Sequence, residues 1–220
     1  MRITTCWVRH GESAKVGRKV EDKEDGGPPL SKLGHAQARV VAERLAAYPW
    51  EAVISSPLNR AAQTAQAIGT RCNVTVCLDS RLTEFSEGEF VVMKGSTAEG
   101  RTTGSAACTR RTELRAHFRR RVGEALRELG NGGWGKRVIV VSHSGVMNEI
   151  LAIVLGIRSL DRFHIDTTGI VRLTLNHSES AVVKSVNDIW HLEDPLAIED
   201  VVVESASGLD YDVVSDKHGL

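Results

Sequence analysis

Residues 4–13 read TTCWVRHGES, a short apolar run that ends in Arg9, His10 and Gly11. The apolar and β-branched residues at 3–8 predict a first β-strand. Ligands of open α/β sheets bind at the carboxyl ends of strands, so two basic side chains at this point indicate a ligand-binding site. The alternative is a surface turn that carries two basic residues. The rest of the chain decides between the two interpretations.

A second strand end carries another histidine. The unbroken apolar run RVIVVS at 137–142 predicts a central strand that is covered on both faces, and His143 follows it directly. Because the carboxyl ends of parallel strands meet at one edge of a sheet, we expect His10 and His143 to face the same crevice.

The segment SSPLNRAAQTA at 55–65 adds a second arginine. It follows a short strand expected at 51–56, and Ser56 and Pro57 predict the N-cap and first residue of a helix that ends near residue 70. Arg60 then lies in the first helical turn, where unpaired N–H groups favour an anion. Two arginines, two histidines and a helix N-terminus predict a site for a phosphoryl group.

The remaining pattern predicts an α/β fold, namely a three-layer sandwich with a largely parallel central sheet and helices on both faces. We expect residues 1–192 to form this domain, with a small lid at about 85–110 over the C-terminal end of the strands. Residues 193–220 are expected to be an acidic appendage. The other expected elements are a loop at 14–29, helices at 31–47, 111–129 and 145–155, and strands at 73–79, 170–176 and 181–186.

Composition excludes several classes of protein. Lys+Arg and Asp+Glu both number 28 in 220 residues, which argues against a nucleic-acid partner. The four cysteines show no CxxC spacing and predict free thiols in a reducing compartment. The longest apolar stretch, at 150–157, is too short to span a membrane. We therefore expect a cytoplasmic protein without a membrane partner, and a homodimer is one option for its assembly.

Six segments, in order, resemble the histidine phosphatase superfamily, which has the phosphoglycerate-mutase-like fold. A lone Arg-His-Gly is a weak signal, whereas six ordered matches are strong. The segments are VRHGES (8–13), LSKLGHAQA (30–38), SSPLNRAAQTA (55–65), LTEFSEGEF (82–90), VSHSG (141–145) and VNDIWHL (186–192).

The resemblance implies a role for each matching residue. His10 would be the nucleophile, with a backbone carbonyl near Gly11 holding its second ring nitrogen. Arg9, Arg60 and a protonated His143 would stabilise the charge on the phosphoryl oxygens. Glu84 would protonate the leaving oxygen and later activate water. The residues expected to bind substrate are Arg9, Gly11, Ser13, Arg60 and Ser144, and neither a metal nor a cofactor is implied.

The expected function is a metal-independent phosphomonoester hydrolase that acts through phosphohistidine on a small phosphorylated substrate. A phosphoglycerate-type mutase, a protein phosphohistidine phosphatase and a non-catalytic phosphate-binding scaffold stay open. The chain departs from the family where Lys15-Val16 replaces Trp-Asn, where Asn148 replaces Arg, and where Phe90-Val91-Val92 replaces Trp-Glu-Gly. The basic run 119–121 is expected to be a solvated helix face, and His191 to pack beneath the site.

Overall fold

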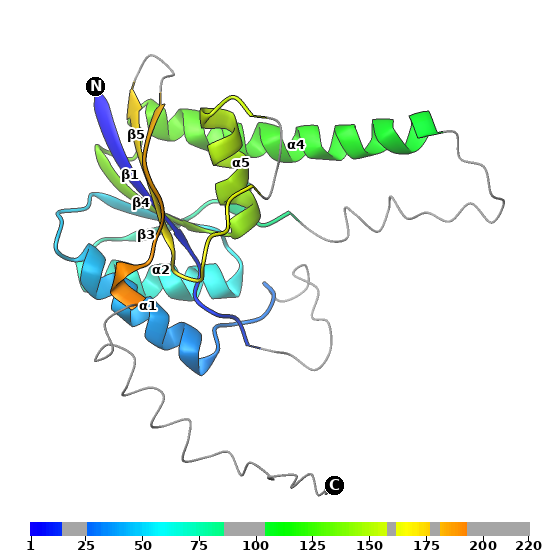
Figure 1. Cartoon of the computed structure of the whole chain (residues 1–220). Helices are drawn as coiled ribbons and strands as arrows, with labels where there is room; N and C mark the ends of the chain where they lie inside the picture. The colour runs from blue at the N-terminus through cyan, green and yellow to red at the C-terminus, as the bar shows by residue number, and fades with distance from the viewer. Residues whose placement is uncertain (15–25, 86–103, 158–161, 177–180, 193–220) are drawn as a thin grey trace, which may run out of the picture.

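A six-stranded sheet forms the middle layer of the protein (Figure 1). The computed structural model describes residues 1–14, 26–85, 104–157, 162–176 and 181–192, and for 104–114 it describes only the backbone. The strands lie in the order β3-β2-β4-β1-β5-β6. Their bounds are β1 Arg2–Arg9, β2 Ala52–Ser55, β3 Val76–Leu78, β4 Arg137–Ser142, β5 Ile170–Asn176 and β6 Ala181–Asp188.

The sheet is largely parallel, as predicted. β1, β2, β3 and β4 pair in parallel, whereas β5 is antiparallel to both of its neighbours, β1 and β6. β5 is therefore the one described strand that runs against the rest. β5 and β6 form the expected antiparallel pair at one side of the sheet.

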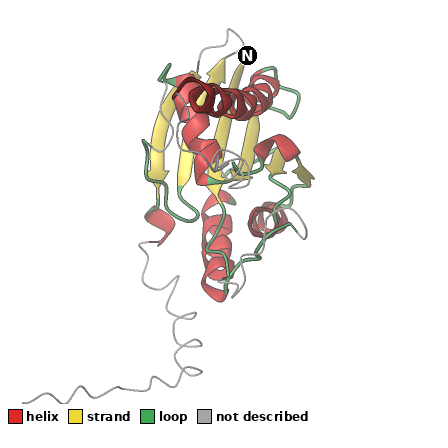
Figure 2. Cartoon of the chain, turned by 90° about the vertical axis from the view of Figure 1, so that its right-hand side faces the viewer, coloured by secondary structure: helices red, strands yellow, loops and turns green. Residues whose placement is uncertain are grey.

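Helices cover both faces of the sheet (Figures 1 and 2). The described helices are α1 Lys32–Leu45, α2 Asn59–Cys72, α4 Gly104–Gly130 and α5 Ser144–Val154, with short 3₁₀ turns η1 Ser80–Leu82 and η3 Trp190–Leu192. Alternate β1 side chains point to opposite faces. Ile3 and Trp7 pack with α4 and α5, whereas Cys6 and Val8 pack with α1 and α2. The predicted three-layer sandwich is confirmed.

The expected start of α2 is wrong by two residues. The helix begins at Asn59, and Leu58 is its N-cap in an extended conformation (φ −65°, ψ 136°). The Ser56 hydroxyl accepts a bond from the Leu58 N–H and contacts the ring of His143. The N–H groups of Ala61 and Ala62 both donate to the Leu58 carbonyl, so the helical bonds begin at Leu58 and Ser56 and Pro57 stay outside the helix.

Two further boundaries differ from the sequence expectation. α4 begins at Gly104 rather than near 111, so residues 104–110, at the end of the expected lid, are helical, in keeping with the helix-forming Ala106 and Ala107. β3 covers Val76–Leu78 alone, because Asn73 adopts a left-handed conformation (φ 55°) that ends α2. Three predicted segments lie wholly or mostly outside the described residues. They are the appendage (193–220), the lid (86–103 of it) and the loop at 14–29 (15–25 of it).

No helix in the described ranges is long and apolar enough to cross a membrane. Cys6, Cys72 and Cys77 carry free thiols, as expected. Burial between β1 and the α1–α2 layer raises the pKa of the Cys6 thiol to about 12.

The turn after β1 is fastened to the first turn of α1. Ser31 is the N-cap of α1, as predicted, and its hydroxyl accepts a bond from the Gly34 N–H at 2.9 Å. The side chain of Gln37 accepts a bond from the Glu12 N–H at 2.8 Å. A Cβ on Gly34 would lie 2.0 Å from the carbonyl oxygen of Glu12. A Cβ on Gly11 would lie 2.5 Å from the carbonyl oxygen of Gly34. Both positions therefore need glycine.

We predict that Gly34→Ala destabilises the protein by roughly 1–3 kcal/mol or more, because the added methyl group meets backbone that cannot rotate away. Gly123→Ala in α4 is the matched control, since its Cβ would lie 3.8 Å from the side chain of Ile153 in α5, an ordinary van der Waals contact. This control should gain about 0.5–1 kcal/mol. Urea unfolding of the two variants measures both values, and equal stabilities would contradict the close packing.

Candidate active site

Four side chains of the predicted site converge at the carboxyl ends of three neighbouring parallel strands. Arg9 is the last residue of β1 and His10 follows it; His143 follows β4 and is the N-cap of α5. Arg60 is the second residue of α2, which follows β2. The rings of His10 and His143 have centroids 5.0 Å apart at an interplanar angle of 61°. The convergence predicted from the sequence is confirmed.

The hydrogen bonds of His10 define its tautomer. Its Nδ1 lies 2.7 Å from the carbonyl oxygen of Gly11, which can only accept, so Nδ1 carries a proton. Its Nε2 lies 3.1 Å from Nε of Arg60, whose N–H can only donate, so Nε2 presents its lone pair. His10 is thus neutral, with Nε2 as the nucleophilic atom.

Backbone bonds hold His10 on several sides. Its N–H donates to the carbonyl of Ser142 at 2.9 Å, and the Thr168 N–H donates to the Arg9 carbonyl at 3.0 Å. The Gly11 N–H donates to the hydroxyl of Thr64, which in turn donates to the Arg60 carbonyl. Both backbone polar groups of Gly11 are therefore used within the protein. Gly11 supports His10 in this way, and its expected contact with substrate stays a prediction; the supporting role of Thr64 was not predicted.

The loop that contains Ile165, distant in the sequence, orients the guanidinium group of Arg9. Its Nη1 donates to the carbonyl of Ile165 at 2.6 Å, and its buried Nε has no partner among the described residues. Asn148 orients that loop, because its side chain accepts from the Phe163 N–H and donates to the Phe163 carbonyl. Burial lowers the pKa of Arg9, with Glu84 and Asp166 acting in the opposite direction.

The closing segment VNDIWHL supports the same loop. The side chain of Asn187 accepts from the Asp166 N–H and donates to the Asp166 carboxylate at 2.7 Å. The ring of His191 lies 3.1 Å from the Thr168 hydroxyl and is 6% exposed. His191 packs beneath the site, as predicted.

His143 is fully buried. Its Nε2 lies 2.8 Å from the Ser56 hydroxyl, and its Nδ1 has no partner among the described residues. Burial, followed by His10 and the arginines, lowers the pKa of His143 well below 6.5. The lowered pKa favours the neutral form of His143 in the unliganded site, and the protonated form expected with a bound phosphoryl group stays a prediction. A bound dianion would raise this pKa again.

Glu84 lies at the N-terminus of α5. Its Oε1 accepts from the Phe85 N–H at 2.9 Å and its Oε2 from the Gly145 N–H at 3.2 Å. Burial raises the pKa of Glu84, against the opposing effect of these N–H groups and of Arg60 and Arg9. A raised pKa suits a carboxyl group that must donate a proton near neutral pH.

The other predicted residues lie at the margin or outside the described residues. Ser13 is half-buried and pairs with Leu30 in an isolated bridge, and Ser144 is half-buried at the first position of α5. Their contacts with substrate stay predictions. The departures at 15–16 and 90–92 lie outside the described residues. No cluster of three or more metal-ligating side chains occurs within the described ranges.

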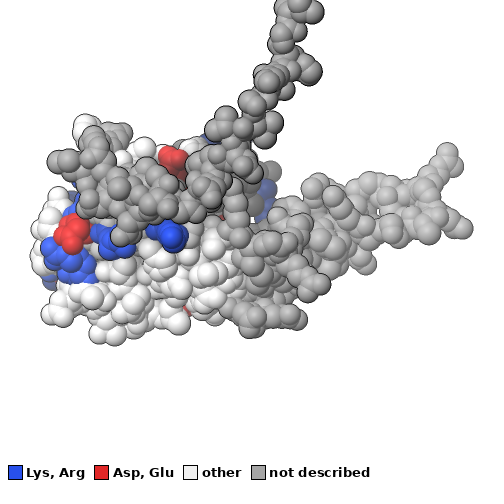
Figure 3. Space-filling model, turned by 90° about the horizontal axis from the view of Figure 1, so that it is seen from below, with Lys and Arg blue, Asp and Glu red and all other residues white. Residues whose placement is uncertain are grey.

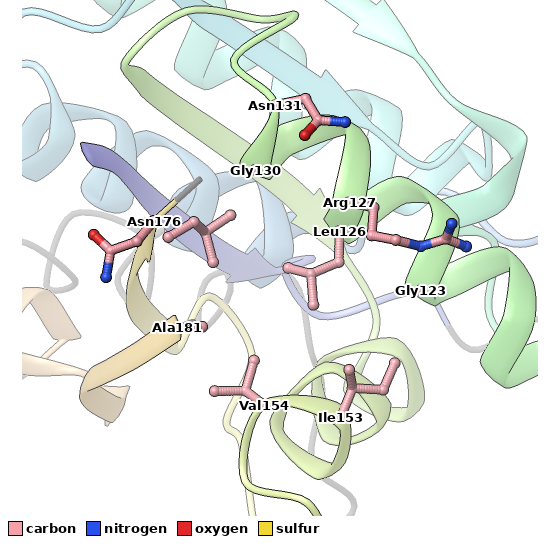
Figure 4. A pocket seen from close by; sticks show the side chains of 10 residues that line it. Gly123, Leu126, Arg127, Gly130, Asn131, Ile153, Val154, Asn176 and Ala181 are labelled. Atoms are coloured by element: carbon pink, nitrogen blue, oxygen red, sulfur yellow. The ribbon is translucent and has the colours of Figure 1, made fainter. Parts of the chain in front are cut away.

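A cavity of about 320 Å³ lies elsewhere, between α4, α5, β5 and β6 (Figure 4). Leu126, Ile153 and Val154 line it on the helical side, and Asn176 lines it from β5. Asn176 pairs with Arg2 at the start of β1, whereas His10 follows the end of β1. The cavity and the four converging side chains therefore lie at opposite ends of the sheet.

The Arg60 guanidinium group and the His10 ring of the site are largely buried. Arg60 is 7% exposed and His10 7% exposed. The surface in Figure 3 shows Lys and Arg side chains near Asp and Glu side chains on a mostly uncharged face. Buried guanidinium groups interact more strongly with an anion than such screened surface charges do.

Comparison with known proteins gives a family and a fold. A family model described as the histidine phosphatase superfamily (branch 1) matches residues 5–188. The probable phosphoglycerate mutase GpmB of Proteus mirabilis is 29% identical over 212 residues, which cover 88% of this chain and 96% of that protein. The structure of Bacillus stearothermophilus YhfR has a TM-score of 0.66 at 20% identity, over 87% of this chain and 100% of that chain.

A second solved structure is a phosphoserine phosphatase from Entamoeba histolytica in complex with 3-phosphoglyceric acid. Its TM-score is 0.63 at 21% identity, over 86% of this chain and 99% of that chain. Both structures share the fold of this chain. The family match confirms the resemblance that the six sequence segments indicate.

We predict that His191 makes the stability of the protein depend on pH. Burial lowers the pKa of His191 from 6.5 to about 4, so the unfolded chain binds a proton that the folded chain excludes. The free energy of unfolding is then at its full value above about pH 6.5. It falls by about 3 kcal/mol in total as the pH is lowered toward about 4. Between pH 6 and 5, His191→Gln should lose about 1 kcal/mol less than the wild type in urea unfolding. Equal losses would contradict a neutral, buried His191.

Proposed function

The chain belongs to branch 1 of the histidine phosphatase superfamily, and we propose that it is a phosphomonoester hydrolase that acts through phospho-His10 on a small phosphorylated metabolite. One observation carries the proposal. The Nδ1 proton of His10 is held by the Gly11 carbonyl, so the Nε2 lone pair faces the Arg60 guanidinium, to which a phosphoryl group would bind.

In the first step, the Nε2 lone pair of His10 attacks phosphorus and the bond from phosphorus to the ester oxygen breaks. Arg60 transfers its hydrogen bond from Nε2 to a phosphoryl oxygen. Glu84 donates its proton to the leaving oxygen, so that a neutral alcohol departs. The Gly11 carbonyl stabilises the positive charge that develops on the imidazole ring.

In the second step, the Glu84 carboxylate removes a proton from water as the water oxygen attacks the phosphorus of phospho-His10. The bond from phosphorus to Nε2 breaks, and its electron pair returns to the ring. Inorganic phosphate leaves, and Glu84 is again protonated. One carboxyl group serves both steps because each is the reverse of the other in its proton transfer.

Two arginines and His143 supply the charge stabilisation. Arg9 Nε and His143 Nδ1 are buried atoms without partners among the described residues, so each gains a hydrogen bond when a phosphoryl oxygen arrives. The dianion favours proton uptake by His143, which then becomes a charged donor. Preorganised donors of this kind supply most of the rate acceleration in phosphoryl transfer.

A phosphoglycerate-type mutase is the second candidate. The observation that favours it is the likeness to curated relatives such as the probable phosphoglycerate mutase of Proteus mirabilis. A mutase needs the same phospho-His10 but passes the phosphoryl group to a phosphoglycerate instead of to water. The Trp-Asn pair expected after RHGES is replaced by Lys15 and Val16, which favours the hydrolase.

We predict that rapid quenching with a ³²P-labelled phosphate ester traps label on His10, as an adduct that is stable to alkali and labile to acid. His10→Ala should lose the label and at least about 10³-fold in kcat/KM. His117→Ala, an exposed histidine on α4, should keep both. Label on another side chain would contradict the mechanism.

The fate of the label before quenching separates the two candidates. When unlabelled 3-phosphoglycerate is added to the labelled enzyme before the quench, the label should appear as inorganic phosphate if the protein is a hydrolase. Transfer of most of the label to the phosphoglycerate would instead establish the mutase.

A further inference from the structure

Arg121 of α4 holds the backbone that carries Glu84. Its Nη1 donates to the carbonyl of Arg81 at 2.6 Å and its Nη2 to the carbonyl of Glu84 at 3.4 Å. Its guanidinium carbon lies 4.6 Å from the centroid of the Phe118 ring, one turn earlier on the same helix. The planar fork of an arginine is suited to bonding two carbonyls at once.

The segment before Glu84 has its own anchors. Arg81 pairs with Glu128 of α4 at 2.6 Å, and the Ser142 hydroxyl donates to the carbonyl of Leu82 at 2.8 Å. These contacts fix η1 but end two residues before Glu84. The Arg121 bond, in contrast, reaches the backbone of Glu84 itself.

Hydrogen bonds hold both the side-chain carboxyl group and the backbone carbonyl of Glu84. Its carboxyl group accepts from the Gly145 N–H, while its carbonyl accepts from Arg121. The next residue, Phe85, packs edge-on against Phe118 with ring centroids 5.0 Å apart. Arg121 and Phe85 therefore contact the same ring, and loss of Arg121 would free the Glu84 carbonyl and remove one side of that packing.

We propose that Arg121 is a positioning residue for proton transfer, which aims the Glu84 carboxyl group at the leaving oxygen. The inference rests on the proposed function, in which Glu84 is the acid. A misplacement of the carboxyl group by about 1 Å is enough to reduce the rate by roughly 10²-fold.

This role corrects the expectation of a solvated face at 119–121. Arg120 is exposed, but Arg119 pairs with the buried Glu149 at 2.6 Å and Arg121 is half-buried against the Glu84 segment. Arg120 therefore provides a matched control, since it has the same charge on the same helix and lies next to Arg121.

The experiment measures kcat/KM over a series of substituted phenyl phosphates whose leaving groups differ in acidity. The full-length proteins are the wild type, Glu84→Gln, Arg121→Ala, the Glu84→Gln/Arg121→Ala double variant and Arg120→Ala. Poor leaving groups need the acid, whereas dinitrophenolate does not. Arg121→Ala should lose about 30-fold with phenyl phosphate and less than about 3-fold with 2,4-dinitrophenyl phosphate. Arg120→Ala should match the wild type across the series.

The double variant shows whether Arg121 acts through Glu84. Its dependence on leaving-group acidity should be no steeper than that of Glu84→Gln, because the acid is already absent. Arg121→Lys, which keeps the charge but not the fork, should lie between Arg121→Ala and the wild type; it also serves if Arg121→Ala does not fold.

Three results would overturn the inference, and they separate a failure of the Arg121 role from a failure of the Glu84 role. If Glu84→Gln steepens the dependence but neither Arg121 variant does, or if Arg121→Ala lowers every substrate equally, Arg121 is only structural. If Glu84→Gln itself leaves the dependence unchanged, Glu84 is not the acid, and that part of the proposed function fails together with the inference.

Discussion

The hydrogen bond between Nδ1 of His10 and the carbonyl of Gly11 is the interaction on which the rest of the site depends. This bond places a proton on Nδ1, and the Arg60 N–H that donates to Nε2 requires the lone pair of a neutral ring at that atom. The carbonyl can act in this way only because the turn is rigid. Gly11 and Gly34 let the turn pack directly against the first turn of α1, and Thr64 holds the Gly11 N–H.

Burial shifts the pKa values of Glu84 and His143, which lie beside His10, in opposite directions. In both groups it disfavours the charged form. It raises the pKa of Glu84 and lowers that of His143, so both favour their neutral forms before substrate binds. Arg9 and Arg60 add positive charges that do not depend on these two groups. A phosphate dianion is the ligand that balances them, and it also favours the charged form of His143. This arrangement supports the proposed phosphate-ester substrate.

The sequence predicts the parts of this arrangement that follow a local rule. Apolar runs that end in Arg9-His10 and in His143 identify adjacent strand ends, and the helix start at 55–65 brings in Arg60. Contacts across long sequence separations leave no such pattern. The Ser56 hydroxyl bonds a histidine 87 positions later, and Arg121 bonds the Glu84 carbonyl from 37 positions away. Composition alone favours a solvated surface for Arg121, because nothing nearby in the chain indicates its partner.

The central claim is that His10 is neutral, with its proton on Nδ1. The ¹⁵N chemical shifts of the His10 ring, measured in the unliganded protein near neutral pH and assigned with His10→Ala, test it directly. The account predicts a protonated Nδ1 and an unprotonated Nε2. A protonated Nε2 would contradict it, because the atom proposed to attack phosphorus would then have no lone pair to offer.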